Sequence, residues 1–264
     1  MAKAPTTAGL FDTQADPVVR RIGLAEIRTA LARGYADFSA TPTQLLFLGL
    51  IYPLIGILAA TAASGGALLP LLYPIVAGLS LMGPVAAVGI YELSRRRERG
   101  YTVSWLNAFD VLRSRSIGSI AALGLLLCAI FVAWLFAAQA IYRSTMGDVF
   151  PDSIGDFLTR IFTTSEGWQL ILWGNAIGFL FAVAVLTLTV VSFPMLLDRD
   201  VGVRVAVRTS IRAVMANPVT MSIWGLIVAA ALFVGCLPFF VGLAVVMPVL
   251  GHSTWHLYRQ VVEA

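Results

Sequence analysis

The stretch IGSIAALGLLLCAIFVAWLFAAQAIY, residues 117–142, decides the fold of this chain. It carries no charged side chain and is longer than the roughly 20 apolar residues that a helix needs to cross about 30 Å of hydrocarbon. The whole chain shares this bias, because 59% of its 264 residues are hydrophobic and 12% are charged. A soluble domain is about half apolar and about a quarter charged. The sequence therefore predicts an integral membrane protein and excludes an ordinary soluble enzyme.

Five further apolar segments approach the same length, and turn residues or charged clusters separate most of them. Together with the first, they occupy residues 44–63, 67–93, 117–142, 168–197, 219–234 and 238–258. The last two are divided by a Gly-Cys-Leu-Pro break, which favours a hairpin over one long helix. The predicted fold class is all-α integral membrane, with six transmembrane helices arranged as three hairpins. Residues 1–20 are predicted to be a disordered cytoplasmic segment, and 21–264 a single membrane domain.

The basic residues fix the predicted orientation. Of the 18 lysines and arginines, only Arg143 and Arg160 lie in the connection 143–166, where four acidic residues accompany them. All the others flank the spans on the opposite side. Because cytoplasmic loops carry the excess of Lys and Arg, we expect a multi-pass protein with both termini in the cytoplasm.

A stretch with apolar residues at helical spacing precedes each predicted pair of spans. The three stripes are Ile27, Leu31, Tyr35 and Phe38; Trp105, Leu106, Phe109 and Leu112; and Val207, Ile211, Val214 and Met215. We expect each stretch to form a cytoplasmic amphipathic helix on the membrane surface. The chain then divides into three repeat units, 21–100, 101–200 and 201–262. Parallel repeats occur in transport proteins, and they also arise when a stable hairpin is duplicated.

The outer connection carries a stripe of its own, formed by Ile154, Phe157, Leu158, Ile161 and Phe162. It predicts a short helix that either lies on the outer surface or packs as a lid on the bundle.

His252 and His256 are the only histidines, and they lie near the cytoplasmic end of the last predicted span. Their spacing of four residues puts both imidazoles on one helix face, where they can hold a metal ion or relay a proton. A metal site needs a third ligand, and Glu92 is the best available one because the repeat aligns it with His256. The alternative is that both histidines bond to backbone or headgroup atoms at the end of the helix.

Two groups of arginines border the spans on the cytoplasmic side, namely Arg95, Arg96 and Arg97, and Arg204, Arg208 and Arg212. The second group forms a stripe opposite the apolar face of its helix. Both groups are candidates for contact with anionic headgroups or a partner protein. The first group also serves as a topology anchor, and Glu92 beside it is suited to a local ion pair. The net charge of +4 is explained in this way, so we expect no nucleic-acid partner.

Several motifs resemble one bacterial family. They are IGLAEI at 22–27, ARGYADF at 32–38, IYPLIG at 51–56, GP at 83–84, GIYE at 89–92, SRR at 94–96 and GHSTWHLYR at 251–259. From about Ile22 to Val262 the chain resembles DUF2189, a family of uncharacterised integral membrane proteins. The resemblance implies the inner membrane of a bacterial cell and no established activity.

Relatives of this kind sometimes carry a label as cytochrome c oxidase subunit I. A haem–copper core needs about six histidines and about twelve spans. This chain has two histidines and six predicted spans, which argues against a catalytic oxidase subunit. An accessory role near a respiratory complex is compatible with the sequence.

The predicted spans contain little chemistry. Gln139 and Asn175 are their strongly polar residues, and no charged residue falls at mid-membrane, which counts against an ion-coupled transporter or pump. Phosphate-loop, HExxH, GxSxG and CxxCH motifs are absent, so we expect no enzyme and no cofactor. The predicted role is a non-enzymatic accessory, assembly or scaffold protein whose partners are membrane lipids and another membrane protein. The alternatives are a transporter or channel built from the repeats, and a haem- or metal-binding protein that uses His252 and His256.

Overall fold

The structure, a computed structural model, describes residues 17–43, 66–148 and 151–263, together with positions 47, 49, 51 and 57. Every regular element within these residues is a helix, which confirms the all-α class. The first predicted span, 44–63, lies almost wholly outside the described residues. The same holds for the N-terminal segment as far as position 16.

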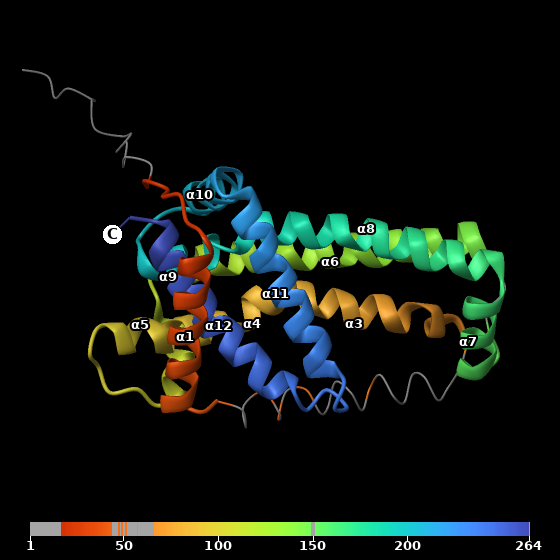
Figure 1. Cartoon of the computed structure of the whole chain (residues 1–264), viewed down its shortest axis with the longest axis horizontal. Helices are drawn as coiled ribbons and strands as arrows, with labels where there is room; N and C mark the ends of the chain where they lie inside the picture. Colours follow the sequence, from red (N-terminus) through yellow and green to blue (C-terminus); the bar gives the residue numbers. More distant parts are fainter. Residues whose placement is uncertain are drawn as a thin grey trace, which may run out of the picture.

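Three helical segments are long and apolar enough to cross a membrane. They are α6 (Ile117–Met146), α8 (Ser165–Thr189) continued by α9 (Ser192–Asp198), and α11 (Pro218–Cys236). They coincide with the third, fourth and fifth predicted spans. Only 17–33% of their apolar windows is buried within the chain, so most of this surface needs a lipid environment. In Figure 1, α6 and α8 run side by side and α11 crosses them obliquely.

The second predicted span, 67–93, does not form one continuous helix. It divides into η1 (Gly66–Leu71), α3 (Leu72–Leu81), α4 (Gly83–Ala86) and α5 (Val88–Glu98). The interruption falls at the Gly-Pro pair 83–84, because proline has no N–H for the preceding turn and its ring clashes with that turn. Its apolar part forms a shorter helix, Leu69–Leu81. From Val88 to Ser94 most residues of α5 are buried, and Glu92 and Ser94 are among them.

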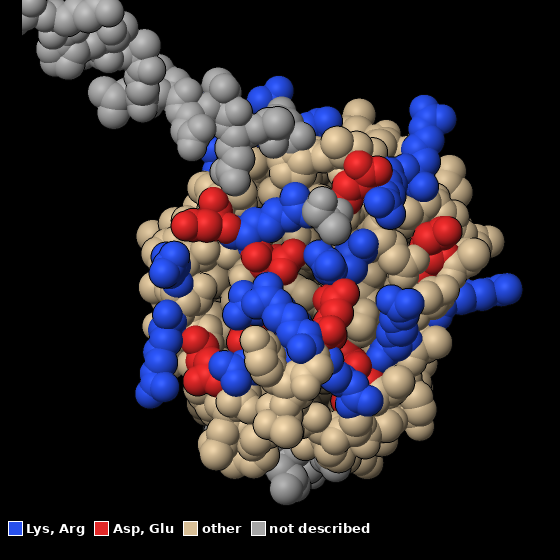
Figure 2. All heavy atoms as spheres, turned by 90° about the vertical axis from the view of Figure 1, so that its left-hand side faces the viewer, with Lys and Arg blue, Asp and Glu red and all other residues tan. Residues whose placement is uncertain are grey.

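A compact charged layer closes one end of the long helices, and we call it the end layer. It consists of α1 (Leu24–Ala40), α5, α9, α10 (Val203–Ala216) and the C-terminal half of α12 (Leu243–Val261). These helices pack around a core in which Phe193, Met195, Leu196 and Trp255 are fully buried. Figure 2 looks onto this end and shows acidic and basic side chains interspersed over it. Most ion pairs between described residues lie in this layer.

The chain enters the end layer at a break between α8 and α9. Ser210 of α10 accepts a hydrogen bond from the Val191 N–H at 3.2 Å and donates one to the Thr187 carbonyl at 2.8 Å. Both backbone groups would otherwise lack partners at the interruption. The break redirects the buried helix α9 into the layer.

The sixth predicted span, 238–258, begins later and divides into two environments. Residues 237–242 form a turn in which Phe239 and Phe240 adopt positive φ, and α12 starts at Leu243. From Gly251 onward α12 lies in the end layer, where His252, Ser253 and His256 are buried. With these polar residues in its second half, α12 is not among the helices that are long and apolar enough to cross a membrane.

The face of α1 that packs on α12 differs from the predicted apolar stripe. Its buried residues are Ile27, Ala30, Gly34 and Asp37, whereas Tyr35 of the stripe is 62% exposed. The reason is close approach, because a Cβ on Gly34 would overlap the backbone of Ser253. Small residues therefore form the closest part of the contact, and Ile27 is the member of the predicted stripe that is buried with them.

The two ends of the described chain meet beside α10. Val19 and Val262 form an antiparallel bridge, and the Arg20 N–H donates to the Val261 carbonyl at 2.8 Å. Asn217 holds the following segment, because its amide accepts from the Ile22 N–H at 2.7 Å and donates to the Arg20 carbonyl. The N-terminal segment is thereby fixed by residues that come about two hundred positions later in the chain.

At the opposite end, the outer connection forms α7 (Ile154–Thr163), as predicted (Figure 1). Gly167 of α8 lies against its last turn, and Phe157 contacts Tyr142 of α6 with ring centroids 6.3 Å apart. Ile154, Leu158 and Phe162 remain about half exposed. The helix is thus attached to the bundle along one edge and presents the other side outward.

The predicted stripe of the middle unit lies on η2 (Trp105–Arg113), a 3₁₀ helix whose N-cap is Ser104. Ala108 and Val111 are its buried residues, and Gly89 of α5 closely approaches Ala108. The larger side chains Trp105, Leu106, Phe109 and Leu112 are about half exposed or more.

Candidate functional site

The end layer contains a buried polar network centred on Asp37 of α1. Its Oδ2 atom accepts from Ser94 Oγ of α5 at 2.6 Å and from His256 Nε2 of α12 at 2.8 Å. Its Oδ1 atom lies 3.1 Å from Nε of Arg97. One carboxylate thus joins three helices that are far apart in the sequence.

The hydrogen bonds of this network have a defined direction. A serine hydroxyl has one proton, and an ionised carboxylate can only accept, so Ser94 donates to Asp37. His252 Nδ1 lies 2.7 Å from Ser94 Oγ and must then be the donor to that oxygen. Protons therefore point from His252 through Ser94 to Asp37, and from His256 Nε2 to the same carboxylate.

Each imidazole keeps one nitrogen without a partner. His252 Nε2 and His256 Nδ1 are buried and make no hydrogen bond. In a neutral imidazole whose other nitrogen donates, such an atom is a bare acceptor. Protonation of either ring would instead bury an unpaired N–H group, which carries a desolvation cost.

The surroundings shift two proton affinities in this network. Burial alone would raise the pKa of Asp37, but the hydrogen bonds from His256 and Ser94 outweigh it and leave the pKa below its ordinary value of 3.8. Burial lowers the pKa of His252 to about 4, although the charge of Asp37 acts in the opposite direction. At neutral pH the network accordingly holds one carboxylate charge and an uncharged His252.

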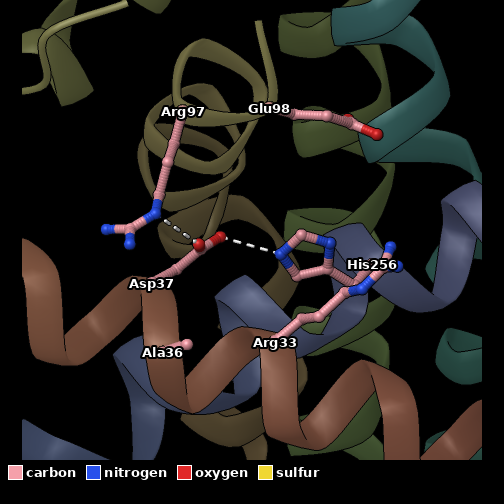
Figure 3. A pocket seen from close by; sticks show the side chains of 6 residues that line it. All are labelled: Arg33, Ala36, Asp37, Arg97, Glu98 and His256. Carbon is pink, nitrogen blue, oxygen red and sulfur yellow. Dashed lines mark hydrogen bonds and ion pairs between the residues drawn. The ribbon is translucent and has the colours of Figure 1, made fainter. Parts of the chain in front are cut away.

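A hollow of about 260 Å³ lies beside the network (Figure 3). Its lining residues are Arg33, Ala36, Asp37, Arg97, Glu98 and His256. Figure 3 shows Asp37 between Arg97 and His256, with Arg33 extending from α1 toward the His256 ring. The hollow gives solvent access to the edge of an otherwise buried site.

The three residues predicted as metal ligands do not form one group. His252 and His256 meet around Asp37, as described above, whereas Glu92 pairs with Arg95 at 2.6 Å and with Arg96 at 2.8 Å. Among the residues that the structure describes, no group of three or more His, Cys, Asp or Glu side chains is arranged to hold a metal ion. The local ion pair expected for Glu92 is present, and metal binding stays a prediction without a third ligand.

The six candidate arginines fall into two environments. Arg95 donates to the Leu197 carbonyl, Arg96 also pairs with Asp110 at 3.0 Å, and Arg97 pairs with Asp37. These three side chains lie mainly within the end layer, with Arg97 the most exposed of them at 42%. Arg204, Arg208 and Arg212 line the exposed side of α10.

Two further carboxylates connect the helices of the end layer. Glu98 accepts from Arg259 at 3.1 Å and from the Trp255 indole at 3.1 Å. Asp198 accepts from Tyr258 at 2.9 Å and lies near both Arg259 and Arg99. Acidic residues from α5 and α9 are thus bonded to α12.

Asp37 and Ser94 were not identified as site residues from the sequence, although both lie in the motifs that resemble the family. The sequence did contain an indication that Asp37 is buried, because Asp37 follows Ala30 and Gly34 on one face of a helix, and small residues on a face indicate a close contact. A charged residue on such a face requires a buried partner. Ser94 had no comparable signal, since nothing local distinguishes it from other serines near an arginine cluster.

Membrane-length apolar helices capped by a charged layer define a helical integral membrane protein. Residues 72–198 match the model of DUF2189, described as a predicted integral membrane protein, which confirms the predicted resemblance over this part of the chain. The N-terminal and C-terminal motifs quoted for the resemblance lie outside the matched range. No curated protein and no solved structure matches the chain.

Proposed function

We propose that this chain is a non-enzymatic scaffold or accessory protein of the inner membrane of a bacterial cell. It would present a rigid cytoplasmic layer to lipid headgroups and to another membrane protein, such as a subunit of a respiratory complex. One observation carries the proposal: the acidic groups Asp37, Glu92, Glu98 and Asp198 all form ion pairs within the end layer. Paired in this way, they hold helices together and are not arranged around a reacting group.

The hydroxyl beside the two histidines is not an accessible nucleophile. Ser94 is the hydroxyl closest to a histidine, yet it is fully buried and its proton is committed to Asp37. A catalytic serine needs a histidine that accepts its proton and a site where substrate can approach. This arrangement supports a structural use of the Asp–Ser–His network.

We propose the six-span topology with three hairpins and with both termini in the cytoplasm. The bridge between Val19 and Val262 supports it, because both ends of the described chain reach the same charged layer. The position of α7 at the far end of α6 and α8 supports it as well (Figure 1). In this topology, α1, η2 and α10 lie at the cytoplasmic membrane surface, one before each hairpin.

The exposed side chains of these three helices suit that position. Tyr35 of α1, Trp105 and Phe109 of η2 and Met215 of α10 are exposed apolar residues. Arg204, Arg208 and Arg212 line the exposed side of α10. Aromatic and basic side chains are typical of helices that lie at an anionic membrane surface.

The transporter and the haem or metal alternatives remain predictions. Of their key residues, Asn175 accepts from Tyr73 at 3.0 Å on the exposed side of the helices, Gln139 is half-buried on α6, and the histidines bond to Ser94 and Asp37. None of these arrangements favours either alternative over a scaffold.

Two measurements test the proposal. The protein, extracted in mild detergent from its native membrane, should carry along one membrane-protein partner in a defined ratio, and reversing the charge of Arg204, Arg208 and Arg212 to Glu should release it. The control reverses Arg143 and Arg160, which lie at the opposite end of the long helices. Transport of a solute by the purified chain in liposomes, lost on Asn175→Ala, would contradict the scaffold role.

A further inference from the structure

A polar pair lies on the exposed surface of the long helices, near the middle of α8. The Tyr73 hydroxyl of α3 donates to Oδ1 of Asn175 at 3.0 Å, and both side chains are exposed. Figure 1 shows α3 and α8 on either side of α6, so the pair joins two helices that α6 separates. Asn175 comes ten residues after the start of α8 at Ser165 and fourteen before its end at Thr189, which is roughly 15 Å and 21 Å. In a membrane this position falls within the hydrocarbon core.

The Asn175 amide keeps hydrogen-bonding capacity that the chain does not use. An amide nitrogen has two N–H groups, and an amide oxygen has two lone pairs. One N–H donates to the Ile171 carbonyl at 2.8 Å, and one lone pair accepts from Tyr73. These are the only partners of the side chain among the residues that the structure describes. Each chain therefore turns one spare donor and one spare acceptor toward lipid, which offers a partner for neither.

The face of α8 around Asn175 carries exposed residues at alternating spacings of four and three. They are Trp168, Leu172, Asn175, Phe179 and Ala182, and we call them the α8 seam. The exposed fractions of Leu172 and Phe179 are 65% and 63%. This alternation is the heptad pattern of helices that pack along a shallow left-handed crossing. A single asparagine within such a seam fixes the register of the two helices. The seam therefore has the pattern of a helix–helix contact, with the polar group near its centre.

The described part of the first predicted span does not supply the second helix. Its residues Phe47 and Ile51 are buried in a cluster against which Leu243 and Met247 of α12 pack. These two residues are thus engaged with α12, and Asn175 remains exposed on α8. A helix that covers the α8 seam has to come from another molecule.

We propose that the α8 seam binds the α8 seam of a second copy of this chain, which makes the protein a homodimer within the membrane. Two copies inserted in the same direction are related by a two-fold axis along the membrane normal, and such an axis sets equivalent residues opposite each other. The two Asn175 amides then exchange N–H···O bonds, because each has one spare donor and one spare acceptor. This reciprocal match favours a second copy over an unrelated helix. The inference goes beyond the scaffold role and does not depend on it.

Cysteine cross-linking in native membranes tests the contact face. In a full-length chain that carries Cys128→Ala and Cys236→Ala, an oxidant should link Leu172→Cys into a disulfide-bonded dimer at least about five-fold faster than Trp173→Cys. Trp173 is the matched control, because it is the adjacent residue, is 55% exposed and points roughly 100° away around the helix. Equal rates would show random collision and overturn the proposal. A disulfide between Leu172→Cys and a different protein would assign the seam to another partner and overturn it as well.

A dilution experiment tests the role of Asn175. The purified full chain is reconstituted in vesicles of phosphatidylcholine and phosphatidylglycerol, and single-molecule photobleaching counts the copies in each particle as the protein is diluted in lipid. Asn175→Ala should require a protein-to-lipid ratio about ten-fold higher than wild type for the same dimer fraction, because two interhelical hydrogen bonds are lost. Leu180→Ala is the control, since this side chain is 63% exposed on another face of α8 and its loss should change the ratio by less than about two-fold. Single copies of wild type at every dilution, or equal effects of the two variants, would overturn the proposal.

The two experiments do not share their weak point. If Asn175→Ala lowers the stability of the single chain, the cross-linking of Leu172→Cys still decides, because that variant keeps Asn175. The scaffold proposal is tested by capture of a different protein through α10, whereas the dimer is measured on the purified chain alone. Failure of one proposal therefore leaves the outcome of the other unchanged.

Discussion

Gly34 of α1 lies directly against the backbone of Ser253 in α12. A Cβ atom on Gly34 would lie 2.5 Å from the Ser253 nitrogen and 2.7 Å from its Cα, which are not atoms that can move aside. The same crossing places Asp37, one turn further along α1, opposite His256. The polar network of the end layer therefore depends on a glycine that takes no part in it.

Gly34→Ala should destabilise the protein for this reason. Overpacking of a closed contact costs about 1–3 kcal/mol, which exceeds the gain of about 1 kcal/mol in helix propensity. The measurement is thermal unfolding of the purified protein in detergent. Gly118→Ala on α6 is the control, because nothing lies within 4 Å of its Cβ position and it should unfold at the wild-type temperature or slightly higher.

Asp37→Asn should loosen α1 from α5 and α12. The amide keeps the shape of the carboxylate, but it turns an N–H group toward one of the donors that the carboxylate accepted and loses the charge opposite Arg97. Breaking a buried charge-assisted group of this kind costs about 2–4 kcal/mol. Urea or thermal unfolding measures the change. Asp148→Asn is the control, since that side chain is 88% exposed and should change stability little.

Protonation of the Asp37 carboxylate should make the protein less stable in acid. The pKa of Asp37 is lower in the folded protein than its ordinary value of 3.8, so its contribution is present at neutral pH. It disappears only as the pH falls below about 4 and through the folded pKa. The Asp37→Asn variant should not show this loss of stability below about pH 4. An unchanged acid transition in the variant would show that Asp37 is not its source.

The titration of His252 should change the stability of the protein at a higher pH than that of Asp37. Its pKa falls from 6.5 to about 4 on folding, so the unfolded chain binds the proton more readily between these values. Stability should therefore decrease as the pH falls from 6.5 toward 4, by an amount of order 3 kcal/mol. His252→Asn keeps an N–H group for Ser94 and removes the titration. Its unfolding free energy should vary less with pH in this window, and parallel curves for both proteins would refute the assignment.

Asn217→Ala should release the N-terminal segment. The variant loses the hydrogen bonds that the Asn217 side chain makes with the backbone of Ile22 and Arg20. We expect trypsin to cleave after Arg20 or Arg21 at least about ten-fold faster, because local opening of the backbone controls cleavage. Asn175→Ala is the control, since Asn175 bonds to Tyr73 and Ile171 far from this segment. An unchanged cleavage rate in Asn217→Ala would mean that the Val19–Val262 bridge suffices.

Hydropathy and charge predicted the parts of the fold that depend on local composition. The apolar runs of α6, α8 and α11 became the three membrane-length helices, and the stripe at 154–162 became α7. The same criteria overextended two spans, because they included buried polar residues such as Glu92 and His252 at the ends of apolar runs. Whether such residues meet lipid, water or another helix depends on contacts between distant segments.

The candidate site was predicted in part. The spacing of His252 and His256 on one face was correct, and Glu92 did form an ion pair with nearby arginines. The third member of the histidine cluster is Asp37, more than two hundred residues earlier, and not Glu92. An alignment of repeat units cannot reveal that pairing, since it compares equivalent positions while the network joins non-equivalent ones.

The pairing of the first helix with the last also governs the order of assembly. During synthesis α1 is made before α12, yet the close contact of Gly34, the hydrogen bond from His256 to Asp37 and the bridge at Val19 require residues between 253 and 262. The hairpin of α6 and α8 needs only nearby residues and can form earlier. The end layer can therefore close only after α12 has been synthesised. A chain truncated before α12 would leave Asp37 without His256 and Glu98 without Arg259 and Trp255. Such an incompletely packed state is one that quality-control proteases recognise.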